Sequence, residues 1–246
     1  MSRPGRGEDL VFIGDVHIDR DDSALPAFLE FLDRLGESAT RVVLLGDLFN
    51  LWIGGEGMEQ PHQTAVVERL AALRRRGVVV RYLEGNRDYR IGRSYTGTAI
   101  DEASDEGLVE RLGGHSLYAA HGDLVNLEDR NYRRWRRLSR SAPVWALFRL
   151  LPHGRRMRLA ERLERRFRRT NLDYKREFPE AQVRAYAATL FRQGHDTVVL
   201  GHFHVEKDLS AGDEQGFGRI LVLPEWRESR RHLVARPDGE VSFVDS

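Results

Sequence analysis

Short apolar segments recur along the chain, and each leads into a polar motif that contains Gly, Asp or His. The five segments have four to six residues each and cover residues 10–14, 41–45, 78–83, 116–120 and 197–200. Continuous apolar runs of this length, rich in β-branched residues and bounded by glycine, are typical of strands that are buried on both faces. We therefore predict five buried strands whose polar motifs gather at one edge of a sheet.

Segments with helical periodicity lie between some of these strands in the sequence. Residues 24–35 and 64–76 place apolar side chains at i, i+3 and i+4, which is the pattern of a helix with one buried face. Alternation of strands and helices predicts a layered α/β domain that spans residues 1–246. After Phe217, by contrast, the sequence predicts short antiparallel strands with a Pro-Asp-Gly turn at residues 237–239. The sheet is therefore expected to be mixed.

Residues 129–175 interrupt the alternation and predict an inserted helical cap. Arginines are interleaved there with tryptophan, phenylalanine and leucine at helical spacing. Pro143 and the sequence Pro152-His153-Gly154 divide the segment into two or three helices. Because the segment lies between the fourth and fifth predicted strands, it should lie across the edge where the polar motifs gather.

The formal net charge of +1 conceals a strong asymmetry. Residues 130–169 contain fifteen Arg, no Lys or Asp and only two Glu, so this segment carries +13 and the rest of the chain carries −12. Acidic side chains in the body can hold metal ions, whereas the basic cap can bind anions or rest on an anionic membrane surface. A solvated helical hairpin whose aromatic side chains pack on the body would show the same pattern.

The chain contains no cysteine, so a transition-metal site would have to use His, Asp, Glu or Asn. Residues 1–10 are polar and lack the apolar core of a signal peptide. No apolar run approaches the roughly 20 residues that a membrane-spanning helix needs. We therefore expect a cytoplasmic protein, with peripheral contact to the inner membrane through the cap as an open alternative.

Seven candidate metal ligands lie in the five polar motifs. In chain order the motifs are Asp15-Val16-His17, Gly46-Asp47, Gly85-Asn86-Arg87-Asp88, His121-Gly122-Asp123 and Gly201-His202-Phe203-His204. An Asp-X-His alone is common by chance, and Gly-Asp or Asn86 alone is typical of turns, whereas Gly-His-Phe-His is a stronger signal. The joint occurrence of the motifs near the ends of predicted strands favours a metal site. The other five histidines lack this context and are interpreted as surface or structural residues: His62, His115, His153, His195 and His232.

Two divalent ions roughly 3.5–4 Å apart need a bridging ligand, and a carboxylate with two oxygens suits that role. Asp47 is the predicted bridge. Water held between two such ions has a lowered pKa and can attack phosphorus in line, while positive charge from the metals and Arg87 stabilises the phosphate oxygens. We expect Asp47, Asn86, Arg87 and His121 to be catalytic, and we assign no general acid.

The motif series across residues 14–204 resembles the calcineurin-like metallophosphoesterase superfamily. The resemblance implies a four-layer α/β/β/α sandwich with a two-metal site. It also implies one ion bound by Asp15, His17, Asp47 and His204, and a second bound by Asp47, Asn86, His121 and His202. Manganese is the metal that the resemblance favours, whereas the ligand types alone leave Mg²⁺, Zn²⁺ and Fe²⁺ open.

A narrower resemblance rests on Arg87, on residues 46–54 (GDLFNLWIG) and on the basic cap. These features resemble the UDP-2,3-diacylglucosamine hydrolases of lipid A biosynthesis, which release UMP and 2,3-diacylglucosamine 1-phosphate. Most members of the superfamily have His where this chain has Arg87, and a guanidinium can bind two phosphate oxygens at once. An ordinary surface arginine is the alternative. The resemblance implies substrate contacts at Asn86, Arg87, Asp129, Asn171, Lys175 and His202.

Two departures from that narrower pattern concern specificity. The loop after Trp52 reads Gly54-Gly55-Glu56-Gly57, where paired aspartates are usual. The last motif has Phe203 where threonine is usual, and Val205-Glu206 follows where Arg-Pro is usual. The metal ligands are unaffected, so these departures bear on acyl or nucleotide specificity.

Three alternative functions remain open from the sequence. The substrate could be another nucleotide pyrophosphate or phosphodiester without acyl chains. The basic cap could bind nucleic acid, since basic patches with aromatic side chains bind single strands, although the helical spacing of its apolar residues is typical of packed or lipid-facing helices. A non-catalytic protein that kept the fold is the third alternative, and competent residues at all seven ligand positions argue against it.

Overall fold

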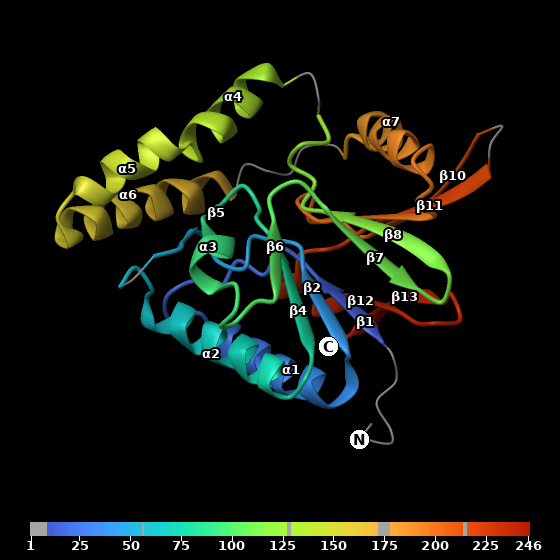
Figure 1. The fold of residues 1–246 in the computed structure, drawn as a ribbon, viewed down its shortest axis with the longest axis horizontal. Coiled ribbons are helices and arrows are strands. Elements are labelled where there is room, and N and C mark those ends of the chain that lie inside the picture. The colour runs from blue at the N-terminus through green and yellow to red at the C-terminus, as the bar shows by residue number, and fades with distance from the viewer. Residues whose placement is uncertain (1–8, 56, 127–128, 172–177, 214–215) are drawn as a thin grey trace.

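Two β-sheets packed face to face form the centre of the protein, and helices cover their outer faces (Figure 1). The computed structural model describes residues 9–55, 57–126, 129–171, 178–213 and 216–246. The first sheet has the strand order β13 (Val241–Asp245), β12 (Arg231–Ala235), β1 (Leu10–Ile13), β2 (Arg41–Leu44), β4 (Val79–Leu83) and β6 (Glu102–Ser104). The second has the order β10 (Lys207–Asp213), β11 (Gly216–Val222), β9 (Thr197–Leu200), β8 (His115–Ala120) and β7 (Leu108–Leu112).

The apolar run of β1 explains the layering. Successive side chains of a strand point to opposite faces, and all four residues of β1 are buried. One pair, Val11 and Ile13, packs with α1 (Leu25–Ser38) and α2 (Pro61–Arg75), whereas Leu10 and Phe12 pack against the second sheet. Helix α7 (Glu180–Phe191) covers the far face of the second sheet. These layers form the predicted α/β/β/α sandwich.

Parallel pairing brings the polar motifs to one end of the sandwich. β1, β2 and β4 are parallel neighbours in the first sheet, and β8 and β9 are parallel neighbours in the second. The prediction that all five motifs follow strands of one sheet is wrong, because these strands divide three and two between the sheets. A buried apolar run does not reveal which sheet a strand joins, since helices or the other sheet cover every face.

The C-terminal strands agree only in part with the antiparallel prediction. β12 and β13 form the predicted hairpin, and in its turn the N–H of Gly239 donates to the carbonyl of Arg236 at 3.0 Å. β11, however, is antiparallel to β10 and parallel to β9. The parallel pair arises because β10, which lies between them in the sequence, reverses the direction of the chain.

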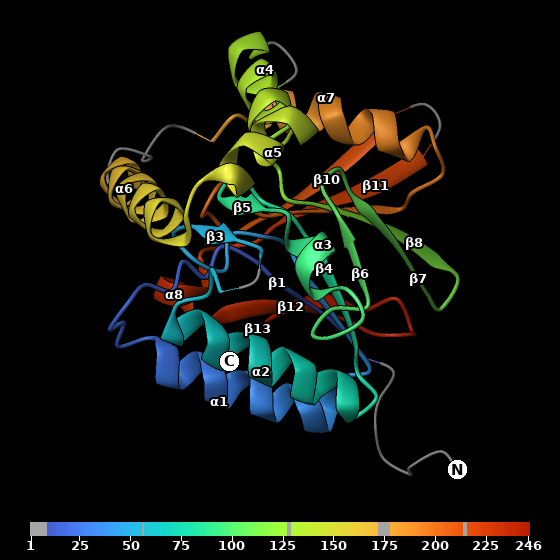
Figure 2. The same cartoon turned by 60° about the vertical axis from the view of Figure 1, so that its left-hand side comes forward.

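Three helices form a cap beside the motif end of the sandwich: α4 (Arg130–Ser139), α5 (Ala142–Leu150) and α6 (His153–Asn171) (Figure 2). Pro143 lies in the first turn of α5, and Pro152 directly precedes α6. Proline is well tolerated at such positions, where its missing N–H has no helical partner. Residues 172–175 of the predicted cap lie outside the described residues.

Both an apolar contact and hydrogen bonds fix the cap to the body. Trp145 of α5 is only 7% exposed and packs on Tyr89 of the short ribbon formed by β3 (Trp52–Ile53) and β5 (Asp88–Tyr89). Arg140 donates to the main-chain carbonyls of Gly85 and Asp88. The cap is therefore tied to the loop that carries the third motif.

Two short helices complete the described elements, α3 (Ile91–Tyr95) after β5 and α8 (Trp226–Ser229) after β11. Trp226 of α8 is buried between α1 and the first sheet, where it packs on Phe28 and Phe31. Among the helices of the described residues, none is both long enough and apolar enough to cross a bilayer.

Candidate metal centre

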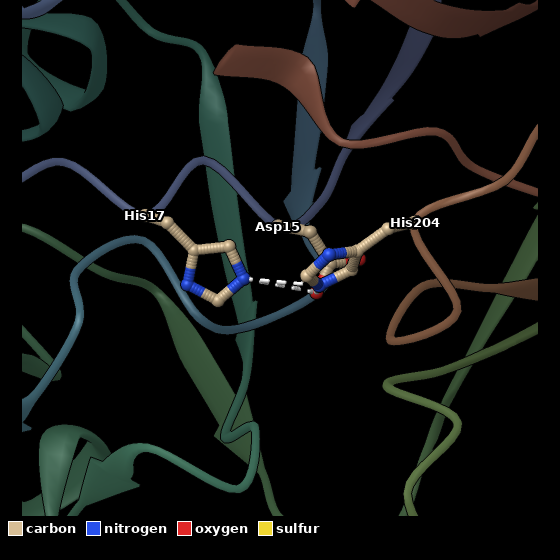
Figure 3. Close-up of side chains that lie close together, drawn as sticks. All are labelled: Asp15, His17 and His204. Atoms are coloured by element: carbon tan, nitrogen blue, oxygen red, sulfur yellow. Dashed lines mark hydrogen bonds and ion pairs between the residues drawn. The ribbon is translucent and has the colours of Figure 1, made fainter. Parts of the chain in front are cut away.

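Asp15, His17 and His204 form the first of two clusters of candidate metal ligands (Figure 3). The imidazole Nε2 atoms of His17 and His204 are 3.1 Å apart, and they lie 3.9 and 3.6 Å from Oδ1 of Asp15. Asp15 and His17 follow β1, whereas His204 follows β9. The cluster therefore joins the ends of the two sheets.

The second cluster contains Asp47 and His121, whose Oδ2 and Nε2 atoms are 3.9 Å apart. Asp15 lies close to both, and one ligand atom from each of the three residues lies within 4.8 Å of the others. Asn86 extends this cluster, since its Oδ1 is 3.0 Å from Nε2 of His121 and 3.1 Å from Nδ1 of His202. All seven candidate ligands thus form one continuous group.

The spacing of these atoms fits metal coordination. Ligand atoms about 2.1 Å from one ion, in tetrahedral or octahedral geometry, are separated by about 3.0–3.4 Å. The distances between His17 and His204 and around Asn86 lie in that range. Oδ1 of Asp15 is buried and accepts no hydrogen bond from the described residues. Because such an oxygen is costly to leave unpaired, the arrangement fits a bound divalent cation.

The backbone at the candidate ligands is unusual. Five of the seven have φ between 50° and 70°, the left-handed region that residues other than glycine rarely adopt. These five are Asp15, His17, Asp47, His202 and His204. Each such residue costs of order 1–3 kcal/mol and persists only where its surroundings fix it. Concentration of this strain at the candidate ligands is typical of a functional site.

Glycines next to the ligands allow the loops to approach one another. A Cβ at Gly85 would lie 2.2 Å from Oδ1 of Asp47 and 2.9 Å from Cε1 of His121. Gly46 has φ +87°, and a Cβ there would lie 2.6 Å from the main-chain N of Gly85. The second motif therefore needs glycine both for space and for conformation, and the third motif needs it for space.

Contacts on the far side of the imidazole rings orient them. Nδ1 of His121 is 2.7 Å from the carbonyl of Leu45, so its Nε2 faces the cluster. Nδ1 of His204 lies 3.4 Å from the carboxylate of Glu225. Nothing in the sequence pointed to Glu225, because it follows a strand that carries no recognisable motif.

Burial and neighbouring charges set the protonation of the histidines. Burial lowers the pKa of His17 well below its usual value and that of His202 to about 4, so both rings are neutral at pH 7. Neutral imidazole is the form that binds a metal. Burial also opposes a charge on His204, but its contacts with Asp15 and Glu225 raise the pKa to about 10. A metal ion must therefore displace a proton from His204.

Asp88, the last residue of the third motif, supports Asp47. Its Oδ2 accepts hydrogen bonds from the main-chain N–H groups of Asp47 at 2.8 Å and Gly85 at 2.9 Å, and from the hydroxyl of Tyr82 at 2.8 Å. Burial, together with the charge of Asp47, raises the pKa of Asp88 to about 7. Asp88 is part of the third motif, but the spacing of the motif did not indicate a role for it.

Arg87 is not a surface residue. Its side chain is buried, its Nε lies 3.4 Å from Oδ2 of Asp47, and its main-chain N–H donates to Oδ1 of Asp47 at 3.0 Å. The alternative of an ordinary surface arginine next to Asp88 is therefore wrong. Arg87 instead holds a permanent positive charge beside the predicted bridging carboxylate.

The five other histidines lie outside both clusters. His115 and His153 are exposed, and His195 has its Nδ1 2.9 Å from the hydroxyl of Ser116. His62 and His232 are buried, and each packs against a phenylalanine ring. These positions agree with their interpretation as surface or structural residues.

A cavity of about 580 Å³ opens beside Asn86 and His202. Asp129, Phe203 and Lys207 also line it. Asp129 caps α4 as well, since its carboxylate accepts a hydrogen bond from the N–H of Tyr132 at 2.8 Å. The two remaining predicted substrate contacts are not placed: the side chain of Asn171 and all of Lys175 lie outside the described residues.

Comparison with known proteins agrees with this geometry. A sequence model of the calcineurin-like phosphoesterases matches residues 9–206. A UDP-2,3-diacylglucosamine hydrolase from Aeromonas salmonicida is 30% identical over 92% of this chain and 89% of its own length. One from Neisseria meningitidis serogroup C is 31% identical over 93% of this chain and 94% of its own length.

Among solved structures, a novel archaeal phosphodiesterase superposes with a TM-score of 0.52 at 10% sequence identity. The superposition covers 96% of this chain and 98% of that chain. At this identity the likeness concerns the fold alone.

Replacing Gly85 tests whether close approach of the loops positions the ligands. Gly85→Ala should weaken Mn²⁺ binding at least about tenfold, because the new Cβ would displace Oδ1 of Asp47. Gly154→Ala is the matched control, since a Cβ there meets no atom within 4 Å and alanine favours the helix by about 1 kcal/mol. Calorimetric titration with Mn²⁺ measures both. Equal affinities in the two variants would refute this role of Gly85.

Proposed function

Because this chain belongs to the calcineurin-like phosphoesterase family, we propose that it is a two-metal hydrolase that cleaves the pyrophosphate of UDP-2,3-diacylglucosamine. The products would be UMP and 2,3-diacylglucosamine 1-phosphate. The observation that carries the proposal is the continuous group of ligand side chains with Arg87 beside Asp47. The names of relatives at about 30% identity support the choice of substrate.

We assign the seven ligands to two ions that share Asp47. One ion takes Asp15, His17, Asp47 and His204, and the other takes Asp47, Asn86, His121 and His202. Ions bound there would lower the pKa of water and polarise phosphate oxygens. We propose Mn²⁺ as the metal because the family resemblance favours it, and the carboxylate, amide and imidazole ligands also suit Mg²⁺, Zn²⁺ or Fe²⁺.

Arg87 supplies positive charge that does not depend on pH or on metal occupancy. Its planar guanidinium can donate two parallel hydrogen bonds to phosphate oxygens. Negative charge shifts among those oxygens during phosphoryl transfer, so a fixed cation beside Asp47 stabilises the transition state. Asn86 and His202 line the neighbouring cavity and so would face the bound substrate.

That cavity would hold the parts of the substrate beyond the pyrophosphate. Its volume of about 580 Å³ lies within the usual range of small-molecule sites. The rings of Phe178 and Phe203, whose centroids are 5.3 Å apart, offer an apolar wall, and Asp129 and Lys207 offer polar contacts. Asn171 and Lys175 stay proposed contacts to the sugar and phosphate.

We propose that the protein is cytoplasmic and that the cap holds it on the anionic surface of the inner membrane. Six large apolar residues of the cap are exposed: Trp135, Leu138, Val144, Leu147, Leu150 and Leu159. They lie among the arginines that give residues 130–169 a charge of +13. Apolar side chains that insert at the interface and cations that attract anionic headgroups together support such binding.

An assay with purified protein tests the substrate. With Mn²⁺, UMP should be released from UDP-2,3-diacylglucosamine much faster than from deacylated UDP-glucosamine. Arg87→Ala should lower turnover by about 10²–10³-fold, because a charge that stabilises the transition state is lost, and Asp47→Ala should abolish turnover. Chromatography of UMP measures both. Equal turnover of the two substrates would favour another nucleotide pyrophosphate, and absence of UMP with or without Mn²⁺ would refute the proposed reaction.

Membrane contact through the cap is tested by sedimentation with phosphatidylglycerol vesicles. Leu147→Ser/Leu150→Ser should bind at least about tenfold more weakly than the native chain, since each buried leucine contributes about 1.5–3 kcal/mol. These residues are 67% and 80% exposed, so the fold should not depend on them. Val109→Ser, at a residue of β7 that is 39% exposed, is the control. Native binding by the leucine variant would exclude this face.

A further inference from the structure

A second cavity, of about 480 Å³, lies between the cap and the body. Helix α5 contributes Arg149 beside Trp145 and Phe148, α6 contributes Arg156, and the body contributes Arg90 together with Gly54, Gly55 and Met58. The seven candidate metal ligands are absent from its lining. It is therefore a site distinct from the metal centre and from the cavity beside Asn86.

Three guanidinium groups line this cavity without a carboxylate among its described lining residues. Within the described part of the chain, Arg90, Arg149 and Arg156 form no ion pair, in contrast to Arg136 of the same cap, which pairs with Asp123 at 2.8 Å. Nε of Arg156 is buried and has no hydrogen-bond partner among the described residues. Like charges gathered at one site repel one another, and a bound anion would offset that repulsion.

The backbone and an aromatic ring hold Arg90 in this place. Its φ of 61° is in the left-handed region, and a Cβ at Gly54 would lie 2.5 Å from its carbonyl oxygen. Its guanidinium stacks over the ring of Trp145 at 5.2 Å. Partial burial, together with the charges of Arg93 and Arg149, lowers the pKa of Arg90, and the charge of Glu84 offsets part of this effect. Arg90 is thus held with a strained backbone beside two other arginines at this cavity.

We propose that the cavity lined by Arg90, Arg149 and Arg156 binds a phosphate group. Guanidinium groups match phosphate oxygens in geometry and donate paired, charge-assisted hydrogen bonds to them. The rings of Trp145 and Phe148 form an apolar wall of the cavity beside the three arginines. Both a free phosphate compound and the headgroup of an anionic phospholipid have this chemistry. Leu147 and Leu150 are exposed on α5, close in sequence to Arg149 of the cavity.

Phosphate binding by metal-free protein tests the proposal, because chelation of metal ions removes their contribution to phosphate affinity. Calorimetric titration with inorganic phosphate should give a dissociation constant at least about tenfold higher for Arg149→Ala/Arg156→Ala than for the native chain. Arg158→Ala/Arg162→Ala removes the same charge from α6 outside the cavity and is the matched control. Arg87→Ala controls for binding at the metal centre. The α6 control should bind phosphate as the native chain does, whereas Arg87→Ala should lose only the part of the binding that occurs at the metal centre.

Thermal unfolding provides an independent measurement on the same variants. At low ionic strength without phosphate, Arg149→Ala/Arg156→Ala should unfold at a temperature equal to or above that of the native chain, because repulsion is relieved. Addition of phosphate should raise the Tm of the native chain and leave that of the variant nearly unchanged. Equal phosphate affinity and an equal Tm gain in this variant and in the α6 control would overturn the proposal.

Vesicles distinguish the two sources of the phosphate group. If free phosphate weakens binding of the native chain to phosphatidylglycerol vesicles but has no such effect on the cavity variant, the cavity binds a lipid headgroup. If added phosphate does not change vesicle binding, although the cavity binds inorganic phosphate, the ligand is a free phosphate compound. Either result is independent of the proposed hydrolase reaction, because neither Arg149 nor Arg156 is assigned a role in that reaction.

Discussion

Two buried carboxylates, Asp15 and Asp47, impose the constraint on which the rest of this site depends. Both lie at the ends of strands within a few ångströms of each other, and both are shielded from water. Such charges are stable only with cations close by. The imidazoles, the buried guanidinium of Arg87 and the space for divalent ions all meet that need. The left-handed backbone at five ligands is the conformational cost of bringing these groups together.

The fold meets this constraint by joining two sheets at one end. A hydrogen bond of 2.6 Å from the N–H of His202 to Oδ2 of Asp15 crosses directly from one sheet to the other. The cap is connected to the same place, because Arg140 donates to the carbonyl of Gly85 while Gly85 contacts Asp47. A displacement of the cap would therefore move the loop that contains Gly85, which contacts Asp47 in the metal centre.

The sequence predicted the buried strands that precede the polar motifs and the set of candidate ligands, because buried runs and short polar motifs are local patterns. The strand pattern alone placed all five motifs on one sheet, whereas the family resemblance implied two, since long-range pairing leaves no local signal in a strand such as β9. Asp88 and Glu225 act through contacts with other ligands, so spacing alone assigned them no role. The arginine cavity was not predictable either, because Arg90, Arg149 and Arg156 come from three separate elements.

Anomalous diffraction from crystals grown with Mn²⁺ tests the two-metal centre most directly. The proposed ligand assignment predicts two peaks roughly 3.5–4 Å apart. One should lie beside His17 and His204 and the other beside His121 and His202, with the carboxylate of Asp47 between them. A single peak, or peaks away from these side chains, would contradict the two-metal centre.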